Sequence, residues 1–233
     1  MQPETRMTRR RLTTPRAAAV AGILFSVLLI ISLVLIRLSV PDDSEDVGAW
    51  LGDGWKSVSL ALNLLPFAGI AFLWFIGVVR DRLGDYEDRF FATVFLGSGL
   101  LYLAMLFSSA AVAGGLISFL GSAEIESIDL GVYTFGRALT YEIMNVYALK
   151  MAGVFMISTC TLALRTEILP RWMAFLGYVL ALLLLLSIGF FPWASLVFPL
   201  WVLLISVHIL LTNLRMRPET GSSPQEMNTS TGI

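Results

Sequence analysis

The sequence predicts an all-α polytopic membrane protein with six transmembrane helices and both termini in the cytoplasm. Three observations predict this class: 57% of the 233 residues are hydrophobic, only 14% are charged, and apolar stretches of spanning length recur along the chain. A soluble domain is about 45–50% apolar and about 25% charged, so a soluble fold would leave too much apolar surface in water. A bilayer would cover that surface.

Six apolar stretches approach or exceed the about 20 residues that a membrane-spanning helix needs. Charged residues, prolines or polar turns separate them, such as Pro41 after the first stretch and Pro170 after the fourth. The third stretch is longer than the about 30 Å hydrocarbon core if it is one straight helix, so we expect it to tilt, protrude or bend. The predicted spans are 17–36, 57–79, 90–120, 138–165, 172–190 and 194–214.

The connections between the predicted spans differ in charge. Residues 41–56 are acidic and contain Trp50 and Trp55, which are typical of a membrane interface. The 80–89 loop mixes charges of both signs, which is typical of a solvated cytoplasmic face. Residues 121–137 are acidic and then aromatic, which suits a short helix lying on the membrane surface.

The basic residues set the predicted orientation. With the N-terminus in the cytoplasm, twelve arginines fall in cytoplasmic segments, five of them within residues 1–16. Only Arg37, Lys56 and Arg137 fall on the outer side, and Lys150 lies within the membrane. This asymmetry is what the positive-inside rule requires.

Composition divides the chain into three parts. Residues 1–16 are polar and basic and form a cytoplasmic N-terminus. Residues 17–214 form the transmembrane domain, whose first apolar stretch has spanning length and is therefore predicted to be a retained helix, not a cleaved leader. Residues 215–233 are poor in hydrophobic side chains and are expected to be a disordered cytoplasmic tail.

Charge and composition exclude several classes of function. The net charge is −1, which provides no overall basic field for nucleic acid. Cys160 is the only cysteine and His208 the only histidine, so no internal disulfide framework and no multi-histidine or multi-cysteine metal site can form. The HExxH, GxSxG, P-loop and dinucleotide-binding signatures are missing. We therefore predict a non-enzymatic protein without cofactor, metal or nucleic-acid partner.

The fourth span is unusual because it carries Glu142, Asn145 and Lys150 within an apolar run. A charged side chain at the bilayer centre costs roughly 2.5–3.5 kcal/mol on insertion scales, so such residues often serve function. Lys150 lies about 12 Å deeper than Glu142 along the helix. Glu142 and Asn145 share a face, and Lys150 is turned roughly 80° away from Glu142.

Polar residues of two other spans fall at similar depths. Asn63 lies about 9 Å deep in the second span, and Pro66 follows it and leaves one helical carbonyl without its donor. Ser108 and Ser109 fall just past the middle of the third span. The sequence therefore predicts a polar cavity in the middle and outer half of the membrane. The candidate cavity residues are Lys150, Asn145, Glu142, Asn63, Ser108 and Ser109.

Each candidate residue also has a purely structural interpretation. Lys150 can snorkel to an interface, and Glu142 can be solvated at a helix N-terminus, where the macrodipole favours an anion. Asn63 and Asn145 can join helices through hydrogen bonds. The two serines and the small residues that follow them, up to Gly115, can serve close helix packing.

Two stretches carry a resemblance that covers less than a third of the chain. Residues 60–99 contain LNLLPFAGIAFLWF and the charged turn RDRLGDYEDR, and residues 164–186 contain the turn Arg-x-x-x-Leu-Pro-Arg-Trp. Both stretches resemble small six-helix bacterial membrane proteins to which no activity is attached. The resemblance implies a location in the bacterial cytoplasmic (inner) membrane and adds no site residues.

Three functional hypotheses follow. The first is a small channel or transporter-like protein whose cavity is built around Lys150, Asn63 and Asn145. The second is an accessory or structural subunit that docks on a larger membrane complex through the 80–89 loop or a lipid-facing helix. The third is a lipid- or pigment-binding membrane protein. We expect membrane lipids, together with a second copy or a membrane-complex partner, as the molecules that contact the chain.

Overall fold

The computed structural model is helical throughout residues 14–40, 47–83, 89–122, 130–166, 169–186 and 193–215 apart from short turns, and these are the residues that the structure describes. The predicted N-terminal segment 1–16 and tail 215–233 lie outside these ranges except for residues 14–16 and 215. The elements are α1 (Thr14–Ser39), α2 (Val47–Leu83), α3 (Arg89–Ser122), α4 (Leu130–Glu142), the π-helix η3 (Ile143–Ala148), α5 (Leu149–Thr166), α6 (Arg171–Leu186) and α7 (Ala194–Arg215).

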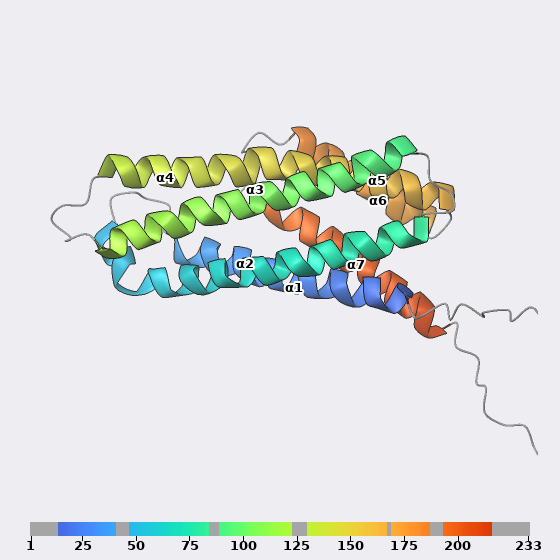
Figure 1. Ribbon diagram of the computed structural model, residues 1–233, viewed down its shortest axis with the longest axis horizontal. Helices are drawn as coiled ribbons and strands as arrows, with labels where there is room; N and C mark the ends of the chain where they lie inside the picture. Colours follow the sequence, from blue (N-terminus) through green and yellow to red (C-terminus); the bar gives the residue numbers. More distant parts are fainter. Residues whose placement is uncertain are drawn as a thin grey trace, which may run out of the picture.

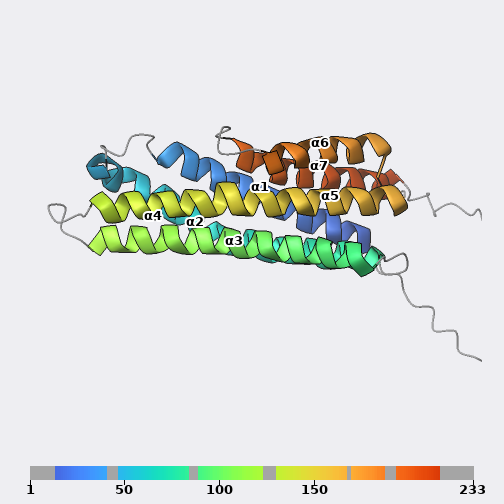
Figure 2. The same cartoon turned by 90° about the horizontal axis from the view of Figure 1, so that it is seen from above.

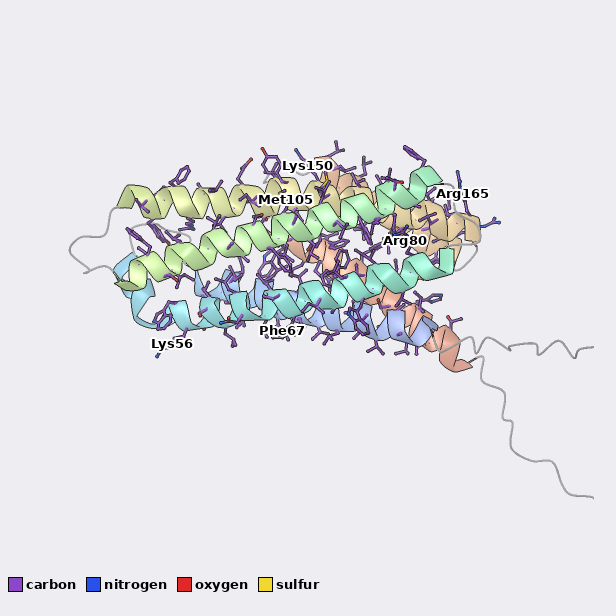
Figure 3. All side chains as sticks on the ribbon, viewed as in Figure 1. Lys56, Phe67, Arg80, Met105, Lys150 and Arg165 are labelled. Atoms are coloured by element: carbon purple, nitrogen blue, oxygen red, sulfur yellow. The ribbon has the colours of Figure 1, made fainter. Side chains whose placement is uncertain are left out.

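The helices lie side by side in an elongated bundle (Figure 1). We call the end at which α1 begins and α7 ends the proximal end, and the opposite end the distal end. Arg165 lies near the proximal end and Lys56 near the distal end (Figure 3). The assignment of the proximal end to the cytoplasm stays a prediction.

Among the described residues, five helical segments are long and apolar enough to cross a membrane. The fifth predicted span corresponds to α6, which has 16 residues and a length of about 24 Å, shorter than the about 30 Å hydrocarbon core. The helices suit a multi-pass membrane protein, as predicted, and the predicted count of six corresponds to five long segments and one shorter helix. The long segments are Ala17–Ser39, Gly54–Arg80, Ala92–Leu120, Gly131–Arg165 and Ala194–Thr212.

Three helices extend past the predicted spans at the distal end. α2 begins at Val47 instead of residue 57, and the surface helix expected in residues 121–137 is instead α4, which continues through η3 into α5. α3 protrudes without an internal break. Figures 1 and 2 show that α2, α3 and α4 reach further at this end than α6 and α7. A small second core at this end buries Val58, Leu120 and Tyr133.

The five long segments form a ring. α1 packs between α2 and α7, α3 packs against α2 and along α4, η3 and α5, and α5 closes the ring onto α7. α6 packs outside this ring, on α5 and α7. The ring requires close helix approach: a side chain at Gly22 would collide with Ser206 of α7 and Phe75 of α2.

Six aromatic side chains, which we call the aromatic cluster, fill the centre of the ring. Each is at most 1% exposed, and the ring centroids of neighbours within the cluster lie 4.5 to 5.9 Å apart. Tilted and edge-to-face pairs of this kind contribute about 0.5–1.5 kcal/mol each beyond their buried area. All five long segments contribute to the cluster, which consists of Phe25, Phe72, Phe95, Tyr102, Phe155 and Phe198.

Candidate functional site

A partly open cavity of about 230 Å³ lies in the distal part of the ring. Its walls come from α1, α2, α3, α4, η3 and the start of α7. Leu65, Leu106 and Met144 line it and also belong to the buried core, so they form its floor. On each helix that contributes to both, the cavity residues lie on the distal side of the aromatic cluster. The cavity therefore ends at the packed core.

The lining of the cavity is mainly aliphatic, with a few polar groups. Two cations line it, Arg37 near the end of α1 and Arg137 in α4. Both arginines also take part in another interaction. Among the described residues that line the cavity there is no Asp or Glu. The cavity thus combines an aliphatic wall with two positive charges.

Two of the six candidate residues from the sequence, Asn145 and Ser109, line this cavity. Ser109 is buried and Asn145 is half-buried. The other four lie outside the cavity lining: three are exposed on the bundle, and the fourth, Lys150, is half-buried and points away from the bundle in Figure 3. The three exposed residues are Glu142, Asn63 and Ser108. The structure therefore brings two of the six candidates together.

The two asparagines bond to their own helices. Asn63 Nδ2 donates to the carbonyl of Ser59 at 2.9 Å, and Asn145 Nδ2 donates to the carbonyl of Tyr141 at 3.1 Å. A polar side chain in an apolar environment finds its nearest acceptor on the preceding turn, and this local bond competes with contacts to other helices. One side-chain N–H of each asparagine is thereby engaged within its own helix.

The π-helix η3 lies in the cavity wall. Where η3 begins, side-chain donors form hydrogen bonds with backbone carbonyl groups. Ser109 Oγ of α3 donates to the carbonyl of Thr140 at 3.0 Å, and Asn145 Nδ2 donates to the next carbonyl, that of Tyr141. Short π-helical turns are rare and are found frequently at functional sites. Its sequence, IMNVYA, contains no glycine or proline that would have marked the turn.

Lys150 lies about 22 Å along the helix from Arg165. α6 covers α5 at Gly153, where an added side chain would lie 3.0 Å from Leu185, and the described part of α6 ends one residue later, at Leu186. Lys150 lies about one turn from this contact, towards the distal end of α5. From there its long stem can carry the ammonium to the distal interface, which favours the snorkelling interpretation.

Helix lengths place the cavity relative to a bilayer. Along their helices, Leu65 lies about 22 Å from Arg80, and Asn145 about 30 Å from Arg165. The hydrocarbon core is about 30 Å thick. If the proximal arginines mark one boundary, the cavity floor lies within the hydrocarbon. Asn145 then lies at the other boundary. Arg37 lies there too, because it is about 30 Å along α1 from the start of the first predicted span.

Sequence reasoning did not identify Arg37 and Arg137 as site residues. It counted them only as two of the three basic residues on the predicted outer side, which has few basic residues. These three residues are the exceptions to the charge asymmetry, and two of them line the cavity. Their position on the outer side is the signal in the sequence that could have identified Arg37 and Arg137. The third, Lys56, is exposed elsewhere at the distal end.

Comparison of this chain with protein-family models, with curated proteins and with solved structures finds no match. The similarity to small six-helix bacterial membrane proteins therefore stays a prediction. The geometry of the described residues is therefore the basis for proposing a function.

Proposed function

We propose that this chain is a non-enzymatic membrane protein that binds an amphipathic molecule in its distal cavity. The observation that supports this proposal is the order of groups along the cavity. With the proximal arginines at one membrane boundary, the aliphatic floor lies at hydrocarbon depth and two arginines lie at or beyond the other boundary. An amphiphile in that half of the bilayer presents its apolar and polar groups in the same order. This function corresponds to the lipid-binding hypothesis from the sequence.

A continuous path for ions or polar solutes has less support from this geometry. A conducting path needs polar groups that replace the hydration of the solute. Here the aromatic cluster fills the ring on the proximal side of the cavity, and all its members are buried. The side-chain donors of Asn145 and Ser109 bond to backbone carbonyls. A site that is closed at one end suits binding better than conduction.

The accessory-subunit hypothesis rests on other parts of the chain. The 80–89 loop, through which docking was predicted, lies outside the described residues at 84–88. Docking on a larger membrane complex therefore stays a prediction. Binding of an amphiphile and docking on a partner do not exclude each other.

The size of the cavity limits its occupant. Pockets that enclose a drug-sized ligand measure about 300–1,000 Å³. At about 230 Å³ the cavity lies below that range. It suits the head and upper chain of a single-chain amphiphile, and it is too small to enclose a two-chain phospholipid.

A pair of alanine substitutions on α3 tests the proposal. Ala113 lines the cavity and is half-buried, whereas Ala111 is exposed on the same helix and is not among the cavity residues. We expect Ala113→Phe to weaken binding of a fluorescent single-chain amphiphile by about tenfold or more, because the ring occupies the ligand's space. Ala111→Phe should leave affinity within about twofold. Binding is titrated with purified protein in nanodiscs, after thermal melting shows that both variants are folded.

Equal affinities of the wild type and the Ala113→Phe variant would place the amphiphile elsewhere. Failure of the wild type to bind any single-chain amphiphile would remove the proposed function altogether.

A further inference from the structure

We infer that the distal cavity selects single-chain amphiphiles with an uncharged hydroxyl head, which donates a hydrogen bond to Oδ1 of Asn145. This selectivity rests on the proposed function and names the chemistry of its ligand. Three polar side chains that line the cavity, Ser109, Thr140 and Asn145, each donate a hydrogen bond to a backbone carbonyl. Their oxygens are left as acceptors, and that arrangement is the starting observation.

The hydrogen bonds hold the three side chains in one wall of the cavity. Ser109 Oγ donates to the carbonyl of Thr140 at 3.0 Å, and Asn145 Nδ2 donates to the next carbonyl along the chain, that of Tyr141, at 3.1 Å. Thr140 Oγ1 donates to the carbonyl of Gly136 at 2.8 Å. A hydroxyl has one hydrogen to donate, so both hydroxyl groups have used theirs and can only accept a bond from a ligand.

Asn145 contributes an amide oxygen to this wall. Its bond to the carbonyl of Tyr141 fixes which end of the amide carries the nitrogen, and no described residue donates to Oδ1. The side chain is half-buried and lines the cavity. When a bound amphiphile displaces water from the cavity, an unpaired Oδ1 is costly, and a head group that donates to it removes that cost.

The charges of the cavity favour an uncharged head. An ammonium head inside the cavity needs a carboxylate, and the described lining contains no Asp or Glu. A carboxylate or a fully ionised phosphate has no hydrogen to donate to the oxygens of this wall. Arg37 and Arg137 line the cavity, but each takes part in another interaction, so we assign neither of them to the head group. A neutral hydroxyl needs no opposite charge.

The floor of the cavity favours an attached chain over water alone. Leu62 of α2 and Leu106 of α3 line the cavity. A water molecule could also donate to Asn145, but it would leave this aliphatic surface uncovered, whereas an alkyl chain removes the surface from water. Both parts of the lining are satisfied by a molecule that joins a hydroxyl to a chain.

The test uses four dodecyl probes with the full-length protein in nanodiscs of neutral lipid. Their heads are a hydroxyl, a methyl ether, an ammonium and a phosphate, and the ether differs from the alcohol in having no hydrogen to donate. Each probe competes with a fluorescent single-chain amphiphile, and its affinity is expressed per mole fraction in the lipid, which corrects for partitioning.

The variant is Asn145→Leu, with Asn63→Leu as the matched control. Asn63 makes the same kind of bond, to a carbonyl four residues earlier, but it does not line the cavity. Thermal melting shows whether both variants are folded.

We expect dodecanol to bind about fivefold more tightly than dodecyl methyl ether, as one hydrogen bond provides, and more tightly than both charged probes. Asn145→Leu should reduce the preference for the alcohol over the ether to less than about twofold and leave the affinity for the ether within about twofold. Asn63→Leu should change neither affinity. If Asn145→Leu does not fold, the comparison of alcohol and ether in the wild type still tests the hydroxyl selectivity.

Each other outcome overturns a distinct part of the inference. If the ether binds as tightly as dodecanol, the hydroxyl selectivity is wrong while amphiphile binding stands. If the phosphate or the ammonium probe binds more tightly than dodecanol, charge selects the head group. A folded Asn145→Leu variant that keeps the full preference would place the hydroxyl at another residue. If none of the amphiphiles binds, the proposed function fails together with the inference.

Discussion

Polar side chains in these helices bond mostly to the backbone one turn earlier. Ser26 donates to the carbonyl of Gly22 at 2.8 Å, and Thr159 donates to that of Phe155 at 2.7 Å, as Asn63 and Asn145 do on their own helices. Such bonds satisfy a polar group without any partner helix. The depth of a polar residue, which the sequence gives, therefore does not show whether the residue lines a path. This is why six candidates of similar depth did not define one site.

Ser109 is an exception, because its hydroxyl crosses from α3 to the carbonyl of Thr140. We expect Ser109→Ala to destabilise the protein by about 1 kcal/mol, the usual net value of one hydrogen bond. The neighbouring Ser108 is exposed, so Ser108→Ala should be neutral within about 0.5 kcal/mol and provides the control. Unfolding of the purified variants in detergent measures the difference. Equal stabilities of the two variants would show that the interhelical bond contributes nothing.

At the level of the helices, hydropathy predicted which segments are helical but not where they end. The long apolar runs became helices because every backbone polar group in a bilayer must be satisfied internally. The distal extensions were missed because acidic and aromatic residues before residue 57 and within 121–137 are as typical of loops and interfaces as of exposed helices. At this end Val58, Leu120 and Tyr133, from three distant segments, are buried together. A reading of one segment at a time does not detect such contacts.

The π-helix shows why the predicted face of the fourth span was only partly right. A regular helix of about 100° per residue places Glu142 on one face with Asn145, as predicted from the sequence, and Leu149 and Gly153 continue that face. Leu149 and Gly153 are buried as that face requires, but Glu142 is exposed. η3 lies between Glu142 and Leu149 and changes the helical phase, so angles counted across it are wrong. The IMNVYA segment contains no glycine or proline that would have predicted this change in helical phase.

For the whole molecule, the charge asymmetry and the arrangement of the helices agree. Arg165 and Arg171 are exposed near the proximal end, and α1 begins and α7 ends there. The positive-inside rule predicts that this end faces the cytoplasm. The cavity would then open towards the outer half of the membrane, where the sequence also placed its predicted cavity.

Thiol labelling tests this orientation. The single native cysteine, Cys160, is buried and can be replaced by alanine. In that background we expect Lys56→Cys to react with a membrane-impermeant thiol reagent on intact cells, because Lys56 is exposed at the distal end. Arg165→Cys should react only after permeabilisation. The reverse pattern would place the proximal end and both chain ends outside.

The chemistry of the cavity differs from the polar cavity that the sequence predicted, and its position in the outer half of the membrane stays a prediction. Asn145 and Ser109 line the cavity, but aliphatic residues form most of its wall and two arginines line it as well. Sequence patterns give depth and the charge of a segment, whereas the direction of a side chain follows from packing around the ring. Arg37 and Arg137 come from α1 and α4, which are far apart in the sequence, and both line the cavity.

The most direct test of amphiphile binding in the distal cavity is photolabelling. A dodecanol that carries a diazirine on its upper chain is added to protein in a bilayer, irradiated, and its adducts are located by mass spectrometry. We expect adducts at cavity residues such as Leu62, Leu106 and Met144, lost with excess unlabelled dodecanol and in the Ala113→Phe variant. Adducts confined to lipid-facing positions such as Phe175 and Leu182 of α6, unchanged by competitor, would contradict a binding site in the cavity.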